Sequence, residues 1–233
     1  KNTLCLTRGR DAFLSQHVGD LKNLETLAFF REMVEHLSGL LEVRPEAVVC
    51  DLHPDYLSTG YALDSGLPVL RLQHHFAHIY GALAENGHDA PALGLALDGT
   101  GYGADGTIWG GELIHMDLGR ADWSRLGRLT PFALPGGEAA IREPWRIALA
   151  LRIQAGEDAG PAPWDAEYAM AATAVREMLA RGLNCPQTSS CGRLFDAVAA
   201  QLGLCLATSY EGQAAIRLEA AADEAALREG AVW

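Results

Sequence analysis

The chain has 233 residues, of which 49% are hydrophobic, and its formal net charge at pH 7 is −12. This length allows one large domain or two small ones with a proper core. The acidity argues against a nucleic-acid partner, because binding to phosphate backbones needs a basic surface. No apolar run is long enough to span a membrane, and the five cysteines form no C-x-x-C pair, so we expect a cytoplasmic protein with reduced thiols.

The first part of the chain alternates between strands and helices. Asn23 can cap a long helix, and Pro45 ends that region. The remaining pattern predicts a hairpin of 3–6 with 12–14 and a buried strand at 47–51. A short helix at 56–62 and another strand at 68–72 follow. This alternation favours an α/β fold with a mostly parallel central sheet.

The rest of the chain starts with a histidine-bearing helix at 74–86 and becomes mainly helical. The run at 93–98 predicts a buried strand that pairs with 107–114 around a glycine loop, and 126–132 predicts one more strand. Further helices are expected at 138–154 (irregular at Pro144), 165–181, 193–204 and 212–222, with a linker at 157–163 and an exposed helix or frayed end at 220–229. We therefore place a strand-rich first lobe at 1–134 and the helical part of a second lobe at 135–233.

Three histidines lie within five residues, at His74, His75 and His78. On a helix, His74 and His78 are four residues apart, and His75 and His78 are three apart, so either pair could bind one metal ion. A third ligand, preferably a carboxylate, must come from elsewhere. The alternative is a hydrogen-bonded structural cluster. No Glu lies between the histidines, so the H-E-x-x-H pattern of zinc proteases is absent.

The glycine-rich segment 98–103 follows the predicted strand at 93–98. Glycines there let the backbone approach a phosphate or another small ligand. Asp98 and Thr100 flank the first glycine, and Asp98 could orient a water molecule or a metal ion. The alternative is a glycine-rich hairpin turn. The segment lacks the G-K-[ST] of a Walker loop and does not open a helix as a dinucleotide fingerprint does.

A third candidate site is the start of the helix near Gly192. Ser189 or Ser190 can cap this helix, and its first N–H groups could bind an anion. Asp196, one turn along, could accept hydrogen bonds from ribose hydroxyls. Spacing alone favours the alternative of a capped amphipathic helix whose Asp faces solvent. Cys191 has no histidine near it in sequence, so we assign no nucleophile there.

Several long motifs occur in a fixed order, among them DLHPDYLST, QHHFAH, LALDGTGYGADGTIWGGE and SSCGRLFDAVAAQLG. Together they resemble the C-terminal transferase domain of the HypF-type carbamoyltransferases, which are maturation factors of [NiFe] hydrogenases. The resemblance covers nearly the whole chain. It implies kinship with the threonylcarbamoyl transferases and the two-lobed α/β fold of sugar kinases, actin and heat-shock ATPases, here with an incomplete second lobe.

The resemblance also implies a reaction. An upstream YrdC-like domain of the same polypeptide would make carbamoyl adenylate from carbamoyl phosphate and ATP. This domain would then pass the carbamoyl group to the C-terminal cysteine of the partner HypE, whose thiocarboxamide becomes a cyanide ligand of the hydrogenase iron. One divalent metal, iron or zinc, would polarise the carbonyl group. The alternatives are a non-catalytic scaffold that docks the partner or the upstream domains, and a metal-dependent amidase, which lacks a Glu base here.

The family's functional residues fall on motifs of this chain. The metal ligands fall on His74 and His78, and the nucleotide and carbamoyl contacts fall on Asp98, Gly99, Thr100, Gly101, Gly192 and Asp196. The partner supplies the nucleophile, so no catalytic residue is assigned here.

This chain departs from the family pattern at three places. Phe76 stands where many members carry a third consecutive histidine. The sequence opens inside the family's G-G-x-L-K-N-T segment, and it ends before an S-G-G-x-x-x-N motif and an Asp-Gly stretch. The Asp of that stretch is the family's third metal ligand. We therefore expect an incomplete site whose closing ligand lies beyond Trp233.

Overall fold

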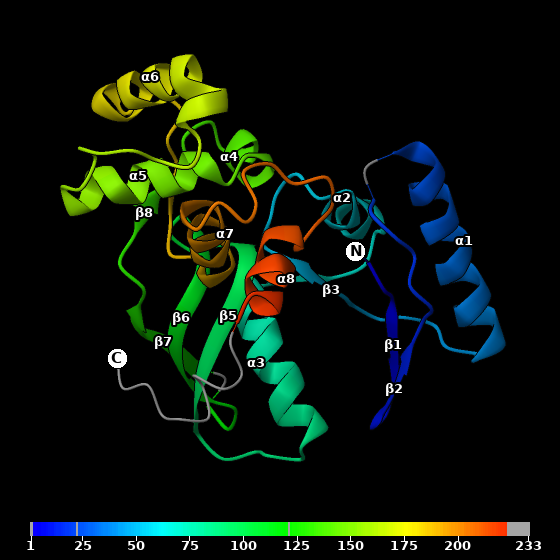
Figure 1. The fold of residues 1–233 in the computed structure, drawn as a ribbon. Coiled ribbons are helices and arrows are strands. Elements are labelled where there is room, and N and C mark those ends of the chain that lie inside the picture. Colours follow the sequence, from blue (N-terminus) through cyan, green and yellow to red (C-terminus); the bar gives the residue numbers. More distant parts are fainter. Residues whose placement is uncertain (1, 22, 121, 223–233) are drawn as a thin grey trace. The chain divides into compact units, whose positions relative to one another are not determined.

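The structure, a computed structural model, describes residues 2–21, 23–120 and 122–222 (Figure 1). The chain forms two compact units, residues 1–77 and 78–233. Both units combine helices and strands, which confirms the predicted α/β class. Within the described ranges, no helix has the length and apolarity needed to cross a membrane.

The first unit begins with the predicted hairpin and long helix. Strands β1 (Cys5–Arg8) and β2 (Asp11–Leu14) pair antiparallel. Helix α1 (Leu24–Leu40) starts at Asn23, whose side-chain oxygen accepts a hydrogen bond from the N–H of Thr26 at 2.8 Å. The predicted cap is therefore confirmed.

A parallel strand pair completes the first unit. Strands β3 (Val48–Asp51) and β4 (Val69–Leu72) pair in parallel, and helix α2 (Leu57–Asp64) connects them and packs on β3. The prediction that β3 is buried is wrong, because Val49 is 60% exposed. Successive strand residues point to opposite faces, and the face that carries Val49 and Asp51 is covered at Asp51 but open at Val49.

The second unit contains the larger sheet, and the expectation of a mostly parallel sheet is wrong for it. Its strands are β5 (Ala92–Tyr102), β6 (Ile108–Asp117), β7 (Asp122–Arg128), β8 (Phe132–Ala133) and β9 (Gln187–Thr188). The order is β5-β6-β9-β8, β7 also pairs with β6, and the parallel pair among them is β6–β9. The short connection between β5 and β6 makes that pair antiparallel, because parallel neighbours need a long crossover.

Strand β5 is buried on one face instead of two. Leu93, Leu95 and Leu97 are 61–70% exposed, whereas Ala96 is 4% exposed. A Cβ added at Gly94 would lie 2.5 Å from the side chain of Ile79 in helix α3 (His74–Glu85). The small residues of the L-G-L-A-L run thus face the helix, and the leucines face away from it.

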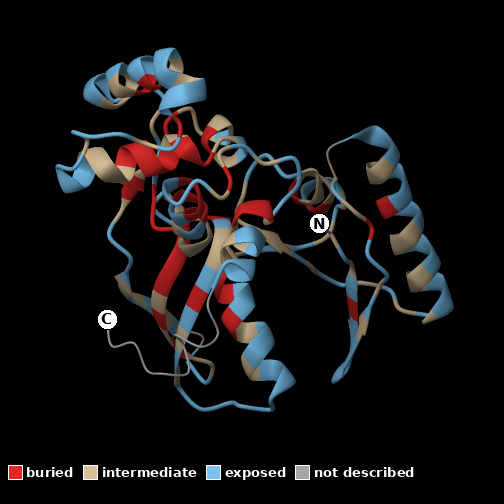
Figure 2. Cartoon of the chain, in the orientation of Figure 1, coloured by how far each residue is buried: buried red, intermediate tan, exposed pale blue. Residues whose placement is uncertain are grey.

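Helices supply the main core of the second unit. They are α4 (Glu138–Arg142), α5 (Trp145–Ala155), α6 (Asp165–Arg181), α7 (Cys191–Gln201) and α8 (Gln213–Ala220). Figure 2 shows buried residues concentrated in α5 and β6, and Trp145 and Trp164 are fully buried. Pro144 divides the predicted helix 138–154 into α4 and α5 because a proline cannot continue the helical hydrogen bonding. Most of the predicted exposed tail, 220–229, lies outside the described residues.

The lobe boundary expected at 134–135 stays a prediction, and the compact units divide at another place. The division falls at Ala77 and His78, inside helix α3. Strands β5 and β6 belong with the later helices because α7 packs on both of them and α5 packs on β8. The segment 157–163 joins α5 to α6 within one unit, so it is a loop and not a domain linker.

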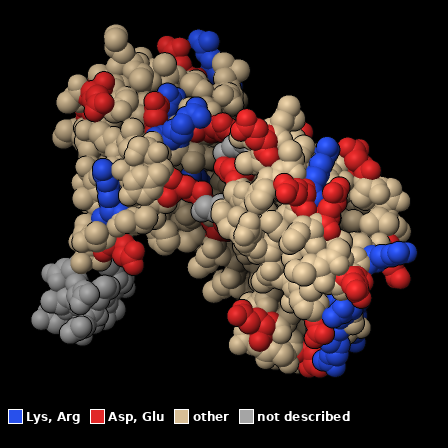
Figure 3. Space-filling view, turned by 90° about the vertical axis from the view of Figure 1, so that its right-hand side faces the viewer, with Lys and Arg blue, Asp and Glu red and all other residues tan. Residues whose placement is uncertain are grey.

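The surface reflects the acidic composition. On the face shown in Figure 3, Asp and Glu side chains lie among Lys and Arg side chains. The expectation that nucleic acid is not a partner stays a prediction.

Candidate metal and nucleotide site

Helix α3 carries the histidine cluster, and its start decides which histidines are available. The side-chain oxygen of Gln73 accepts a hydrogen bond from the N–H of Phe76 at 3.0 Å. The side-chain nitrogen of Gln73 lies 3.0 Å from Nδ1 of His75, which is fully buried. His75 therefore has the structural role that was one of the alternatives, and His74 and His78 remain as the candidate metal-binding pair.

His74 is oriented by a carboxylate that the sequence reasoning did not assign. Its Nδ1 lies 2.7 Å from Oδ2 of Asp51, at the end of β3. Burial raises the pKa of Asp51, but hydrogen bonds from His74 and from the N–H of His53 outweigh burial, and the net shift is downward. A carboxylate on Nδ1 is the usual partner of a metal-binding imidazole and leaves Nε2 for the metal. The sequence signal for this role is the position of Asp51 at the carboxyl end of the predicted strand, in the motif D-L-H-P-D.

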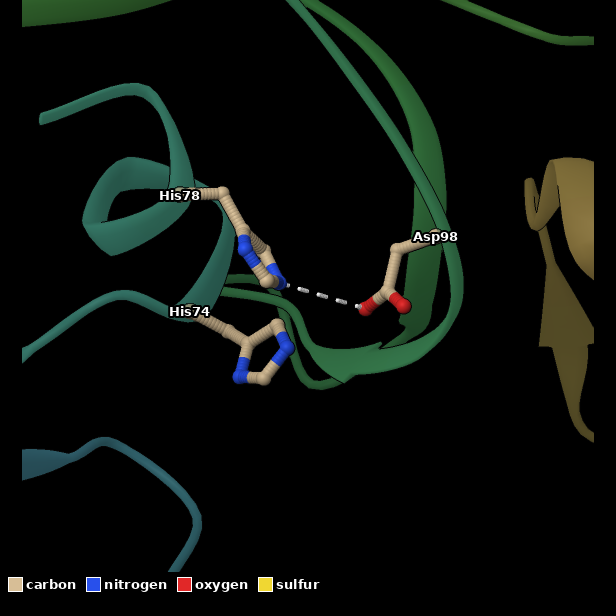
Figure 4. A group of neighbouring side chains, drawn as sticks. All are labelled: His74, His78 and Asp98. Carbon is tan, nitrogen blue, oxygen red and sulfur yellow. Dashed lines mark ion pairs between the residues drawn. The ribbon is translucent and has the colours of Figure 1, made fainter. Parts of the chain in front are cut away.

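Asp98 joins the two histidines. Its Oδ2 lies 4.0 Å from Nε2 of His78, and its Oδ1 accepts a hydrogen bond from the N–H of Gly99 at 2.6 Å. One donor atom from each of His74, His78 and Asp98 lies within 4.8 Å of the others (Figure 4). The two histidines are one turn apart on a single helix, and Asp98 comes from β5. A third donor is thus available within the described residues, and the sequence reasoning had placed it beyond Trp233.

This donor set fits a divalent metal ion. Two imidazoles and one carboxylate are found in zinc and in non-haem iron(II) sites, where they leave coordination positions open for a substrate. The acidic partner of His74 is the kind of outer contact that such sites use. These residues could therefore hold iron or zinc.

The glycine-rich segment is part of strand β5. The strand continues to Tyr102, and its register against β6 shifts between Leu97 and Gly101. This irregularity is a bulge-like break in the ladder, which turns side chains away from their regular direction. Thr100 is exposed and Gly99 is half-buried, whereas Gly101 is buried. A ligand can therefore reach Gly99 and Thr100.

The start of helix α7 packs directly on this segment. The hydroxyl oxygen of Ser190 accepts a hydrogen bond from the N–H of Arg193 at 3.0 Å, so Ser190 is the predicted cap. The same hydroxyl group lies 2.9 Å from the carbonyl oxygen of Asp98 and donates to this region of β5. A Cβ added at Gly192 would lie 2.8 Å from Cα of Gly99. The structure thus brings together two predicted sites that are far apart in sequence.

Strand β6 supplies a third backbone at the same place. A Cβ added at Gly110 would lie 2.6 Å from the carbonyl oxygen of Asp98 and 3.1 Å from Cα of Ser190. We call these three contacting segments, 98–99, 110–111 and 189–192, the glycine junction.

Glu112 was not singled out from the sequence, although it follows the two glycines of W-G-G-E. It is fully buried beside the glycine junction and accepts a hydrogen bond from the hydroxyl of Ser189. Nη1 of Arg125 lies 3.4 Å from its carboxylate. These contacts hold β6 against the turn before α7.

Asp196 is buried, so the alternative of a solvent-facing Asp is wrong. Its Oδ2 pairs with Nη2 of Arg193 at 2.9 Å. Burial raises the pKa of Asp196 to about 6, and the positive charge of Arg193 offsets only part of this rise. Burial also raises the pKa of the Cys191 thiol, which makes the reactive thiolate scarce and agrees with assigning no nucleophile there.

Comparison with known families identifies the class of domain. Residues 1–85 match the family model described as "HypF Kae1-like domain". Residues 94–232 match the model described as "Carbamoyltransferase, Kae1-like Domain, second subdomain". Both matches define a Kae1-like domain.

The chain belongs to the HypF family of carbamoyltransferases. It is 48% identical over 221 residues to carbamoyltransferase HypF of Rhizobium leguminosarum bv. viciae, which covers 94% of this chain and 29% of that protein. It is 50% identical over 230 residues to carbamoyltransferase HypF2 of Cupriavidus necator, which covers 96% of this chain and 28% of that protein. The chain thus spans less than a third of the length of these relatives.

Solved structures support the same family and confirm the fold class. Full-length HypF in a phosphate- and nucleotide-bound form is similar with a TM-score of 0.88 and 39% identity, over 96% of this chain and 29% of that one. HypF of T. kodakarensis is similar with a TM-score of 0.86 and 31% identity, over 94% of this chain and 30% of that one.

Proposed function

We propose that this chain is the carbamoyl-transfer domain of a hydrogenase maturation enzyme. In this proposal it moves the carbamoyl group of carbamoyl adenylate to the C-terminal cysteine of a HypE-type partner. The observation that carries the proposal is the position of Asp98, which adjoins His78 through its side chain and Ser190 through its backbone. A metal-binding group and a nucleotide-binding group would therefore meet at one residue.

The transfer consists of one substitution at the carbamoyl carbon. The partner's cysteine, after losing its proton to solvent, attacks as a thiolate and forms the new C–S bond. The bond from the carbamoyl carbon to the phosphate oxygen breaks, and AMP leaves with the electron pair. Because the partner supplies the nucleophile, this domain needs no covalent catalyst, which agrees with the raised pKa of the Cys191 thiol.

The residues of this chain bind and orient the substrate. His74, His78 and Asp98 would hold a divalent metal, iron or zinc, which when bound supplies Lewis-acid polarisation of the carbamoyl oxygen. Asp51 fixes the ring of His74, so that the ligand atom keeps its direction.

Binding of the nucleotide falls to the residues of β5 and α7. Gly99 and Thr100 are accessible to the phosphate and carbamoyl oxygens. Gly101 and Gly192 also contribute to nucleotide binding in this proposal, although Gly192 is in close backbone contact with Gly99. Asp196 accepts hydrogen bonds from the ribose. The carbamoyl adenylate itself comes from a YrdC-like domain of the same cytoplasmic polypeptide.

The test uses the intact polypeptide that carries this sequence, supplied with ATP, carbamoyl phosphate and the HypE-type partner. Mass spectrometry of the partner's C-terminal peptide measures carbamoylation. We expect the double substitution His74→Ala with His78→Ala to abolish it and the exposed-site control His88→Ala to leave it unchanged. Full activity of the double variant would refute the metal role. Partner binding without carbamoylation by the unsubstituted protein would favour a docking scaffold instead.

A further inference from the structure

Arg193 lies at the glycine junction, and the proposed function assigns it no contact with the substrate. It is in the first turn of helix α7 and is 9% exposed. Its Nη2 pairs with Oδ2 of Asp196 at 2.9 Å and lies 3.7 Å from the point that a Cβ on Gly99 would occupy. The guanidinium group is therefore held beside the accessible part of the glycine-rich segment.

The hydrogen bonding of this guanidinium group is incomplete. Arginine has five N–H donors in a planar fork. Within the described residues, Nε of Arg193 is buried and has no hydrogen-bond partner. A buried donor without an acceptor costs free energy, and a buried ion pair gives little net stabilisation unless its remaining donors are satisfied. The ion pair therefore contributes little to stability by itself. The unsatisfied donor instead favours a hydrogen-bond acceptor that comes from outside the chain.

The surroundings favour a phosphate group as that acceptor. A guanidinium fork matches two oxygens of a phosphate, and the start of a helix adds backbone N–H groups and a partial positive charge. A Cβ on Gly99 would meet Nη2 of Arg193 at 3.7 Å and no closer atom of the described residues, so this side of Gly99 faces the guanidinium group. Asp98, in contrast, brings negative charge, so a phosphate bound here needs a cation close by to offset the repulsion.

We infer that Arg193 is the contact for the phosphate group of a nucleotide bound at the glycine junction, and that Asp196 is the positioning residue for its guanidinium group. The inference rests on the proposed function and deepens it, because it names the residue that recognises the leaving AMP. It also gives Asp196 a second task, since the carboxylate oxygen that pairs with Arg193 is not available to the ribose. Free phosphate shares this chemistry, so the test must separate the two sources.

The test measures dissociation constants by calorimetry on the intact protein with three probes: AMP, adenosine and inorganic phosphate. Arg193→Met removes the charge and the fork, and Arg193→Lys keeps the charge alone. Arg181→Met, at the exposed end of α6, is the matched control. Arg193→Met leaves the buried carboxylate of Asp196 unpaired. A second comparison therefore removes this carboxylate first: the single variant Asp196→Asn is compared with the double variant Asp196→Asn with Arg193→Met. Circular dichroism verifies that each variant is folded.

We expect AMP binding to weaken by about tenfold or more in Arg193→Met, since a hydrogen bond to a charged group is lost, and adenosine binding to change by less than about twofold. Arg193→Lys should lie between the two, and Arg181→Met should match the unsubstituted protein. A ratio of AMP to adenosine affinity that is unchanged in both Arg193 variants would overturn the inference and leave the proposed function standing. Binding of neither AMP nor adenosine to the unsubstituted protein would overturn both. Loss of inorganic phosphate binding with unaltered AMP binding would assign Arg193 to a free-phosphate site, which also overturns the inference.

Discussion

Gly192→Ala tests the packing of the glycine junction directly. In most helices this change stabilises, because alanine is favoured over glycine by about 0.5–1 kcal/mol. Here the added methyl carbon would lie 2.8 Å from Cα of Gly99 and 3.3 Å from the backbone N of the same residue. Backbone atoms cannot turn aside as a flexible side chain can, so helix α7 must move. Overpacking of this kind costs about 1–3 kcal/mol, and we expect a net loss of about 1–2 kcal/mol.

Urea denaturation of the intact protein measures this loss, with Gly81→Ala as the matched control. Gly81 is also inside a helix, α3, but a Cβ there would meet no atom within 4 Å. The control should therefore be as stable as the unsubstituted protein or more stable, by up to about 1 kcal/mol. AMP affinity should fall in Gly192→Ala alone. Equal stability of the two variants would show that β5 and α7 are not in backbone contact.

Three other predictions follow from contacts of the site. Asp51→Asn should lower zinc affinity about 10–100-fold in a chelator competition, because the carboxylate no longer orients His74, and equal affinity would contradict this. Ser190→Ala should destabilise the protein by about 1–2 kcal/mol in urea denaturation, since it removes a helix cap and a bond to β5, and a change below about 0.3 kcal/mol would contradict it. Asp196 has a pKa of about 6 in the folded protein, against an ordinary value of 3.8. Between these two pH values the folded state binds more protons than the unfolded state. The free energy of unfolding should therefore fall by up to about 3 kcal/mol as pH rises from about 4 to 6. Asp196→Asn should remove that slope, and an equal slope in the variant would contradict the assignment.

Sequence periodicity predicted the local elements well. Helix α6 has the predicted bounds, Asp165–Arg181, and the caps at Asn23 and Ser190 are present. These features depend on residues within one or two turns. The parallel arrangement predicted from strand and helix alternation holds for β3 with β4 and for the short pairing of β6 with β9, whereas the other pairs are antiparallel. Pairing depends on connections that periodicity does not describe.

The burial of β5 shows a second limit. The run L-G-L-A-L is apolar at every position, which is typical of a strand covered on both faces. The structure covers only the face with Gly94 and Ala96, and the leucines stay exposed. Residue type alone does not separate a small residue under a helix from a large one on an open face.

The candidate site could be predicted in its parts but not in its connections. The spacing of His74 and His78 is visible in the sequence because both lie on one helix. The sequence does not show that Asp98 is their neighbour. It also does not show the hydrogen bond from Ser190 to Asp98, two residues that are 92 positions apart. The resemblance to HypF-type enzymes assigned both motifs to one ligand, but it did not reveal the ion pair between Arg193 and Asp196.

The bond from Ser190 to β5 has a consequence for hydrogen exchange. One hydroxyl group caps α7 through the amide of Arg193 and also reaches the carbonyl of Asp98. Opening of the first turn of α7 therefore breaks the contact with β5 in the same event, because the same hydroxyl group makes both bonds. A nucleotide that binds at this point should slow exchange of the Arg193 amide, whose protection is then a readout of occupancy.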